Sequence, residues 1–487
     1  MIDIVLFYPK LETVKPRLLP MGVLSIAGPL VEAGFNVKII DQRVDNDWRN
    51  TLLNSLNKKP LLVGFSVMTG IQILNALEAT KLVKKNSNIL TVWGGVHPSL
   101  LPEQTLENSN IDFAVVGEGE NILLNLVKSL KSNQSYKDIP GLGYKEGNEI
   151  VVNPAMAFID LDTLPDIPYH LVDIEKYIQE YSYASGKKAR SIDFYTSRGC
   201  PHRCAFCYNQ EFNKRKWRGN SAQKVVEQIK KLIDNYQISA LDIEDDEFFV
   251  DMKRAKEICE LLIKENINIE IMTTCRVNYV SQRMDGELLN LCKKAGFNAL
   301  SFGVESGSSK IQKMMSKDIT TEQVFDTIKK LKKADIGSKY FFMAGIPREQ
   351  IEDLYATTDL IRQMKELDNG VRIPAWRVFT PYPGTELYGK SIELGFNPPK
   401  NLENWAKYDF KTINMPWVSK KAKKIIKNVI YSIKFLELEK ESSNSFYFNL
   451  SRLYGKTVDY RWRKHWFFFP EKNIILLFLK IKSFLTK

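Results

Sequence analysis

Three cysteines lie close together in the middle of the chain, and their spacing is the feature best suited to chemistry. Cys200, Cys204 and Cys207 follow a C-x-x-x-C-x-x-C pattern directly after the strand-like run 192–195. Three thiolates on one short loop can bind three irons of a cubic iron–sulfur cluster, which leaves the fourth iron without a protein ligand. The spacing therefore favours a [4Fe–4S] cluster with one iron open to another molecule.

Three other interpretations compete with a cluster. A structural zinc ion needs four ligands, usually as two separated pairs, and His202 lies too close to both flanking cysteines to complete a tetrahedron comfortably. A disulfide is disfavoured because the chain has six cysteines and no secretory signal. Coincidence is disfavoured because half of the cysteines fall within eight residues. The default for Cys259, Cys275 and Cys292 is a small core residue, although Cys275, at a strand end, could face a site.

The cysteine loop resembles that of the radical S-adenosylmethionine (SAM) superfamily. This resemblance implies that SAM binds the open iron, that Phe206 lies near its adenine, and that the Asp245-Asp246 neighbourhood meets its amino group. It also implies that Glu305 binds the ribose and that Gly345 begins a turn beside the adenine. Arg276 either pairs with the SAM carboxylate or neutralises nearby acids. The predicted SAM-binding residues are Phe206, Glu244, Asp245, Asp246, Arg276, Glu305, Ser306 and Gly345.

Residues upstream of the cysteine loop carry a second resemblance, to the N-terminal domain of cobalamin-dependent radical SAM proteins. Ser66-Val-Met68 and the later Gly94-Gly95 are similar to the Ser-x-Leu and Gly-Gly elements of cobalamin-binding domains, where small residues let the backbone approach the nucleotide tail. No Asp-x-His-x-x-Gly follows the first strand, which implies a cobalt without a lower histidine ligand. A Rossmann-like domain without cofactor is the alternative. The predicted cobalamin-binding residues are Ser66, Val67, Met68, Gly94, Gly95, His97, Gly117, Glu118, Gly119 and Glu120.

Strand-like and helix-like segments alternate through most of the chain, and they must position these residues. This alternation predicts an α/β fold: a doubly wound Rossmann-like sheet, then a partial (β/α)6 barrel, then a helical extension. The predicted strands are 2–8, 34–41, 61–66, 90–95 and 113–117 in the first part and 192–195, 241–249, 269–276, 299–305, 340–345 and 375–380 in the second. The clearest predicted helices are 71–85, 222–236, 251–266 and 321–334. In both folds, ligands bind at the carboxyl ends of the strands.

These patterns predict four regions along the chain. They are a cobalamin-binding domain at 1–140, a proline-punctuated linker at 141–190 that contains His170, a radical SAM domain at 191–400, and a basic helical region at 401–487. Residues 411–487 contain seventeen basic and five acidic residues, a net charge of +12 that equals the charge of the whole chain. The first 410 residues are therefore neutral, which argues against a nucleic-acid-binding enzyme.

The C-terminal region combines this charge with aromatic residues at 462–469 and an interrupted apolar segment, 474–485, too short to span a bilayer. Such a composition is typical of an amphipathic membrane anchor, although a helical cap with core aromatics fits equally. We expect a cytoplasmic protein with possible peripheral membrane contact, because no run of eighteen apolar residues occurs and the first residues read as a strand.

The resemblances imply an enzyme that uses a [4Fe–4S] cluster, SAM and cobalamin, with a flavodoxin- or ferredoxin-type electron donor. The function we expect is radical C-methylation of an unactivated carbon, in which methylcobalamin donates the methyl group, on a hydrophobic or lipid-linked substrate. Oxidative ring closure without methyl transfer, as in the anaerobic magnesium-protoporphyrin monomethyl ester cyclase, is the alternative within enzymes. A basic-tailed scaffold or nucleic-acid-binding protein with a structural metal is the alternative outside them.

Overall fold

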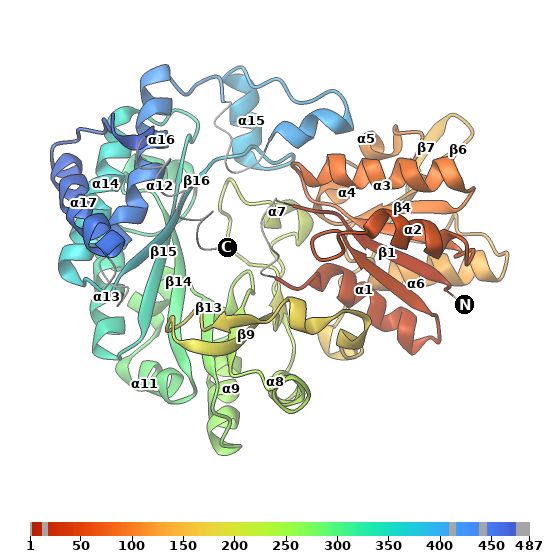
Figure 1. Ribbon diagram of the computed structural model, residues 1–487, viewed down its shortest axis with the longest axis horizontal. Helices are drawn as coiled ribbons and strands as arrows, with labels where there is room; N and C mark the ends of the chain where they lie inside the picture. Colours follow the sequence, from red (N-terminus) through yellow and green to blue (C-terminus); the bar gives the residue numbers. More distant parts are fainter. Residues whose placement is uncertain (1, 12–17, 409–414, 438–445, 474–487) are drawn as a thin grey trace.

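The chain folds around two seven-stranded sheets that lie side by side in a computed structural model (Figure 1). The structure describes residues 2–11, 18–408, 415–437 and 446–473. Sheet A belongs to the N-terminal part of the chain and sheet B to the middle part. The segments after sheet B first reach the N-terminal part and then return to pack against the last strand and a helix of sheet B.

Sheet A has the strand order β2-β1-β3-β4-β5-β6-β7. Its parallel strands are β1 (Ile4–Tyr8), β2 (Val37–Asp41), β3 (Leu62–Ser66), β4 (Leu90–Gly94) and β5 (Phe113–Val115). The antiparallel strands β6 (Leu142–Glu146) and β7 (Glu149–Val152) complete it. Strand β1 is an almost continuous apolar run because both faces of the sheet are covered.

Helices cover both faces of sheet A, as the sequence predicts for a doubly wound fold. On one face Leu24 of α1 (Met21–Glu32) and Ile122 of α6 (Gly119–Lys131) pack with Leu6. On the other face Leu52 of α2 (Trp48–Leu56) and Ile73 of α3 (Gln72–Asn86) pack with Phe7. The short helices α4 (Val96–Leu100) and α5 (Pro102–Leu106) follow β4.

Sheet B is open, with the strand order β16-β15-β14-β13-β12-β9-β8, and it forms the predicted partial barrel. Its six parallel strands are β9 (Lys188–Phe194), β12 (Ala240–Ile243), β13 (Glu270–Thr274), β14 (Phe297–Glu305), β15 (Gly337–Ala344) and β16 (Arg372–Val378). Strand β8 (Gln179–Tyr181) pairs antiparallel with β9 at the edge.

Helices lie on the outer face of sheet B and share one apolar core with it. They are α8 (Ala222–Tyr236), α9 (Met252–Lys264), α10 (Val277–Arg283), α11 (Gly286–Lys294), α13 (Thr321–Lys333) and α14 (Ile351–Leu367). Helix α12 (Ser309–Met314) belongs instead to a separate apolar cluster, in which Ile311 packs with Ala205 of the cysteine loop. In β15 the outward residues are buried, whereas Lys339, Phe341 and Met343 on the other side are half-buried. We call that side the inner face of sheet B.

Two predictions about secondary structure are wrong. The strand expected at 241–249 ends at Ile243, because the acidic residues after it bond to a neighbouring loop; a 3₁₀ turn, Phe248–Val250, follows. The linker expected at 141–190 is structured at both ends, since β6 and β7 belong to sheet A and β8 belongs to sheet B. Hairpins of this kind lack the strand–helix alternation that marks the rest of the fold.

The C-terminal part packs against both halves of the molecule. Trp405, in the 3₁₀ helix Leu402–Lys407, packs against His97 of the N-terminal half and donates a hydrogen bond to Gln104 (2.7 Å). Helix α15 (Glu386–Glu393) precedes this turn, and α16 (Lys420–Glu437) and α17 (Phe446–Arg463) follow it. Residues 438–445, between α16 and α17, lie outside the described ranges.

The aromatic cluster of the tail is divided between core and surface. Trp462, Phe467 and Phe469 are buried, and the Trp462 indole donates to Ser432 (3.0 Å). Trp466 and Phe468 are exposed. The apolar segment 474–485 lies outside the described residues. Among the helices of the described ranges, none has the length and hydropathy needed to cross a membrane.

Candidate active site

The three cysteines lie on a loop that leaves the carboxyl end of β9 and is closed at its base by a short antiparallel pair. Strand β10 (Ser197–Arg198) precedes Cys200, and β11 (Arg218–Gly219) follows the short helix α7 (Asn209–Phe212). Gly199 has φ 84°, and a side chain there would collide with the backbone carbonyl of Lys216. Only glycine fits this position without strain, so Gly199 permits the turn that leads into Cys200.

Two aspartates at the carboxyl end of β12 hold the cysteine loop. The buried Asp245 carboxylate accepts hydrogen bonds from the amide and hydroxyl of Thr196 (2.6 and 2.6 Å) and of Ser197 (3.0 and 2.6 Å). Asp246 accepts one from the amide of Gly199 (2.8 Å). Four bonds occupy the Asp245 carboxylate, so Asp245 is a positioning residue for the loop rather than a free ligand for the SAM amino group.

One of the three cysteines is buried, and an arginine lies beside it. Cys204 is buried, with its Sγ 3.5 Å from a guanidinium nitrogen of Arg276. Burial raises the pKa of Cys200 and of Cys207 to about 12, so iron must displace their protons on binding. No three Cys, His, Asp or Glu side chains of the described residues converge on one metal ion. A cubic cluster does not need such convergence, because each of its thiolates binds a different iron. The donor set therefore fits a cluster.

Arg276, Glu305 and Phe206, three of the predicted SAM-binding residues, gather around Lys317. The ammonium of Lys317 lies 3.2 Å from a Glu305 carboxylate oxygen and 5.8 Å from the centre of the Phe206 ring. Arg276 donates a hydrogen bond to the carbonyl of Lys317. No sequence pattern marks Lys317, which follows α12 in a turn. Glu305 has φ 68° at an irregularity between β14 and β15, a strained conformation of the kind found at ligand sites.

The remaining predicted SAM-binding residues differ in their surroundings. Ser306 is buried, and its hydroxyl shares a hydrogen bond with the hydroxyl of Thr357 (3.2 Å). In this structure Ser306 therefore stabilises the contact between its turn and α14. Gly345 has φ 81°, and its amide donates a hydrogen bond to the Glu349 carboxylate (2.6 Å). Burial raises the pKa of Glu349 to about 8. Glu244 is half-buried on the inner face of sheet B. Binding of SAM by these residues stays a prediction.

The predicted cobalamin residues form one edge of sheet A, at the carboxyl ends of β3 and β4. The Val67 amide donates to Gly94 (2.8 Å), and the His97 amide donates to the Val67 carbonyl (3.1 Å). Gly95 has φ 98°, and a Cβ there would lie 2.8 Å from the Val67 carbonyl oxygen. Met68 is 43% exposed, and space is open where a Gly117 side chain would be. Because the glycines at this edge have no side chains, the edge fits the close approach of a nucleotide tail to the backbone.

His97 lies beside this edge. Its ring is fully buried, with Nδ1 at 3.0 Å from the hydroxyl of Thr69, and burial lowers its pKa to about 4. It is the only histidine among the first 140 residues of the sequence. The ring contacts Thr69, which follows Met68 at the end of β3, and cobalamin binding by His97 stays a prediction.

Glu118 and Glu120 make ion pairs across the boundary between the two halves. Arg198, two residues before Cys200, bonds to Glu118 (2.8 Å), Glu120 (2.5 Å) and the Ser25 hydroxyl (2.7 Å). Arg218 bonds to both oxygens of Glu118 (2.8 Å each). Burial alone would raise the pKa of Glu120, but the charge and hydrogen bond of Arg198 lower it. We call these five residues the Arg198 ion-pair cluster. It ties the base of the cysteine loop to the N-terminal half.

Further contacts show that the carboxyl ends of both sheets face each other. The amide of Leu19 donates to Asp193 at the end of β9 (2.8 Å), and the hydroxyl of Tyr177 donates to Asp41 at the end of β2 (2.8 Å). Cofactors bound at the two sheet edges would therefore meet between the halves, as ligands of parallel sheets do.

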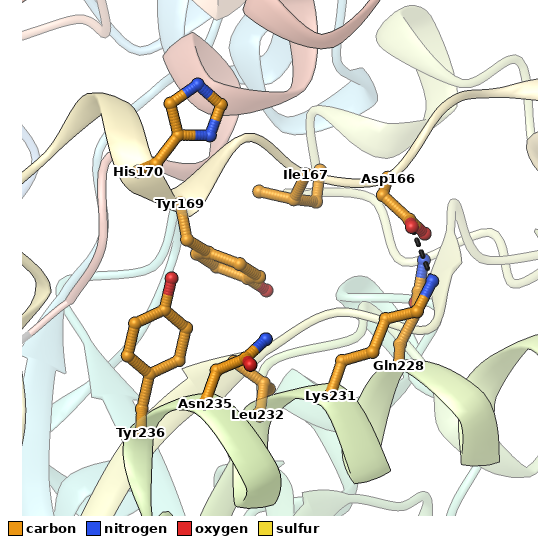
Figure 2. A pocket seen from close by; sticks show the side chains of 9 residues that line it. All are labelled: Asp166, Ile167, Tyr169, His170, Gln228, Lys231, Leu232, Asn235 and Tyr236. Carbon is orange, nitrogen blue, oxygen red and sulfur yellow. Dashed lines mark hydrogen bonds and ion pairs between the residues drawn. The ribbon is translucent and has the colours of Figure 1, made fainter.

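A separate pocket opens between α8 and the segment before β8 (Figure 2). Tyr169 and Tyr236 contact edge to face at one end, and Asp166 pairs with Lys231 (2.5 Å) at the other. His170 is exposed, and its ring points away from the other lining residues. None of the predicted cofactor residues lines this pocket.

The remaining cysteines are core residues. Cys259 and Cys292 lie with their sulfurs 3.9 Å apart in the core of sheet B, as expected from their apolar surroundings. Cys275 is also buried, and its thiol donates to the neighbouring Arg276 carbonyl (3.5 Å). Its burial in the apolar core fits the default of a small core residue.

Two family models match the chain. The radical SAM superfamily model covers residues 194–361, and the B12-binding domain model covers residues 10–127. A protein of Pyrococcus horikoshii named an uncharacterized methyltransferase is 32% identical over 397 residues, which are 80% of this chain and 81% of that protein. The anaerobic magnesium-protoporphyrin IX monomethyl ester cyclase of Synechocystis is 29% identical over 78% of this chain and 74% of its own.

Two solved structures share the fold over nearly the whole chain. The radical SAM methyltransferase TsrM from Kitasatospora setae, with cobalamin and a [4Fe–4S] cluster bound, has a TM-score of 0.69 at 16% identity and covers 96% of this chain and 100% of its own. The cobalamin-dependent SAM radical enzyme OxsB, with aqua-cobalamin and SAM bound, has a TM-score of 0.74 at 20% identity and covers 99% of this chain and 75% of its own.

Proposed function

We propose that this chain, which belongs to the cobalamin-dependent radical SAM enzymes, methylates an unactivated carbon of its substrate. The cofactors of this family are a [4Fe–4S] cluster, SAM and cobalamin. Like other radical SAM enzymes, it needs a substrate and a source of electrons. The observation that carries the proposal is the Arg198 ion-pair cluster, because it joins the cysteine loop to the Gly117–Glu120 element of the B12-binding half. The methyltransferase names of two similar proteins support it.

The chain's own residues would prepare the site in three ways. Asp245 and Asp246 hold the cysteine loop rigid, and Arg276 places positive charge beside Cys204. Glu305 and Lys317 offer a carboxylate and an ammonium to SAM. The facing sheet edges keep water away from reactive species. When bound, the cluster would supply one electron for SAM cleavage, and cobalamin would supply the methyl group that is transferred. Overall, a carbon–hydrogen bond is replaced by a carbon–methyl bond at the expense of two SAM molecules and two external electrons.

The test uses SAM labelled with deuterium on its methyl group. The anaerobically reconstituted holoenzyme is incubated with a reductant and a low-molecular-weight extract of the source cells, and the products are analysed by mass spectrometry. We expect a product that carries the labelled methyl, together with 5′-deoxyadenosine. Formation of 5′-deoxyadenosine with a changed but unlabelled product would instead support ring closure or oxidation, the chemistry in the name of the Synechocystis relative. Running the assay with reduced flavodoxin in place of a chemical reductant tests the proposed electron donor.

We further propose that the tail contacts anionic membranes and that the substrate can be lipid-linked. The observation in favour is that Trp466 and Phe468 remain exposed beside Arg461 and Lys424, whose cations lie over the two rings. Aromatic rings favour the headgroup level, and each nearby basic residue contributes about 1 kcal/mol at an anionic surface.

Sedimentation with anionic vesicles at low salt checks the membrane proposal. Replacing both Trp466 and Phe468 by alanine should lower the bound fraction severalfold and leave the thermal midpoint unchanged, because neither ring is in the core. Replacing the exposed Ile263 and Ile392, which lie elsewhere, is the matched control. Equal pelleting of both double variants would contradict the proposal. Truncation before Arg461 is less useful, since it would remove the buried Trp462.

A further inference from the structure

Three carboxyl groups meet on the inner face of sheet B, near the N-terminal half. Asp193 of β9 and Asp242 of β12 are direct neighbours in the strand register. Ile192 and Leu241, beside them in sequence, pack into the outer core, so alternation along the strands turns both aspartates to the inner face. Glu244, two residues after Asp242, shares a hydrogen bond with it. We call these residues the Asp193–Asp242–Glu244 cluster.

The cluster has hydrogen-bonding capacity that the protein leaves unused. One oxygen of Asp193 accepts the Leu19 amide, but the other, Oδ2, is buried without a partner. The hydroxyl of Ser191, two residues before Asp193 on the same side of β9, is also buried and unpartnered. Within the described ranges, Asp193 and Asp242 have no lysine or arginine at ion-pair distance, although the charges of Arg43, Arg377 and Lys339 act on the three acids from farther away. Unpaired buried carboxylates are costly, and burial raises the pKa of all three groups, that of Asp193 to about 7.

A lysine lies near the cluster, but its hydrogen bond goes to a backbone carbonyl. Lys339 of β15 lies on the inner face and interacts electrostatically with Asp242 and Glu244. Its ammonium instead donates to the carbonyl of Tyr183 at 2.5 Å. Burial lowers the pKa of Lys339 to about 8, so most Lys339 side chains still carry their charge at pH 7. The acids therefore keep unused acceptors, such as Asp193 Oδ2, beside cations that act on them at longer range.

We propose that the Asp193–Asp242–Glu244 cluster binds an ammonium group of the substrate. This inference rests on the proposed function and narrows it to acceptors that carry an amine. An organic ammonium has three N–H donors for the unused carboxyl acceptors, and its positive charge would favour their ionised form. A metal ion is a poorer occupant, because no group of the described acids and histidines has the arrangement to hold one. A wholly apolar substrate would leave these acceptors unused, whereas a lipid-linked substrate with an amine-bearing head would fit.

Binding is tested first without turnover. The thermal midpoint of the reconstituted holoenzyme is measured with n-butylamine, and with n-butanol as the uncharged probe of the same shape. We expect a rise with the amine only, and no rise in the variant with Asp193→Asn and Asp242→Asn. The control variant, Asp166→Asn, changes an exposed carboxylate that already pairs with Lys231 and should keep the response. If the double variant does not fold, Glu244→Gln, at a half-buried position, replaces it and should reduce the rise.

Recognition of the true acceptor is tested second, by extract-stimulated formation of 5′-deoxyadenosine. Acetylating the amines of the extract should abolish the stimulation, and n-butylamine should inhibit it competitively, with an inhibition constant at least tenfold higher after Asp242→Asn. Equal effects of amine and alcohol, a response that survives in the double variant, or stimulation by acetylated extract would overturn the proposal. A substrate that binds through its amine but acquires no labelled methyl would overturn the proposed methylation and leave the ammonium site standing.

Discussion

Cys204→Ala is expected to leave the protein folded but unable to hold its cluster or cleave SAM. The iron content should fall from about four per chain to below about one, because only two thiolates would remain on the loop. SAM cleavage should fall at least about 10³-fold, since the electron enters through the cluster. Iron analysis and 5′-deoxyadenosine formation after anaerobic reconstitution measure both effects. Cys204 is the informative choice because its sulfur lies next to Arg276 in the buried part of the loop.

A second cysteine variant separates loss of the cluster from loss of stability. Cys259→Ala removes a buried thiol from the core of sheet B, beside Cys292, and should cost about 1 kcal/mol of unfolding free energy without changing the iron content. Zinc in place of iron in the reconstituted wild type, or full SAM cleavage by Cys204→Ala, would refute the assignment of the cluster to this loop.

The cysteine loop and most of the parallel strands could be predicted from sequence because their signals are local. The three cysteines fall within one short segment, and α8 lies where its apolar spacing places it, at Ala222–Tyr236. Buried parallel strands such as β1 read as apolar runs. The strand predicted at 241–249 failed for a non-local reason, since Asp245 and Asp246 turn toward the loop that starts at Thr196.

Residues that act through distant partners could not be predicted. Lys317 joins Glu305, Arg276 and Phe206, yet its neighbours in sequence carry no pattern. Glu118 and Glu120 resemble a cobalamin element, but in the fold they pair with Arg198, about 80 residues away in the chain. Asp193 and Asp242 read as ordinary strand residues until the register makes them neighbours. In each case the chemistry depends on side chains brought together by the sheets.

Arg198→Ala is expected to uncouple SAM cleavage from methyl transfer. Arg198 holds the base of the cysteine loop against Glu118 and Glu120, so its loss would let the cluster move relative to the B12-binding half. Glu120 would keep only the Ser25 hydroxyl as a partner, and a largely buried charge left in this way costs about 3 kcal/mol of unfolding free energy. We expect the ratio of 5′-deoxyadenosine formed to methyl groups transferred to rise at least about tenfold, because reacting groups misplaced by an ångström lose about two orders of magnitude in rate.

That ratio distinguishes a positioning role from mere destabilisation, which would lower both products together. Arg203→Ala is the matched control: Arg203 lies in the same loop and pairs with Asp318 at 3.2 Å, but both side chains are more than half exposed. Such a pair contributes at most about 1 kcal/mol, so stability and coupling should both remain close to those of the wild type. Arg198→Lys should recover part of the coupling, because one ammonium can reach one of the two glutamates but cannot bond to both as the guanidinium does. A normal ratio in Arg198→Ala would mean that the two halves keep their alignment through the Leu19–Asp193 and Tyr177–Asp41 contacts alone.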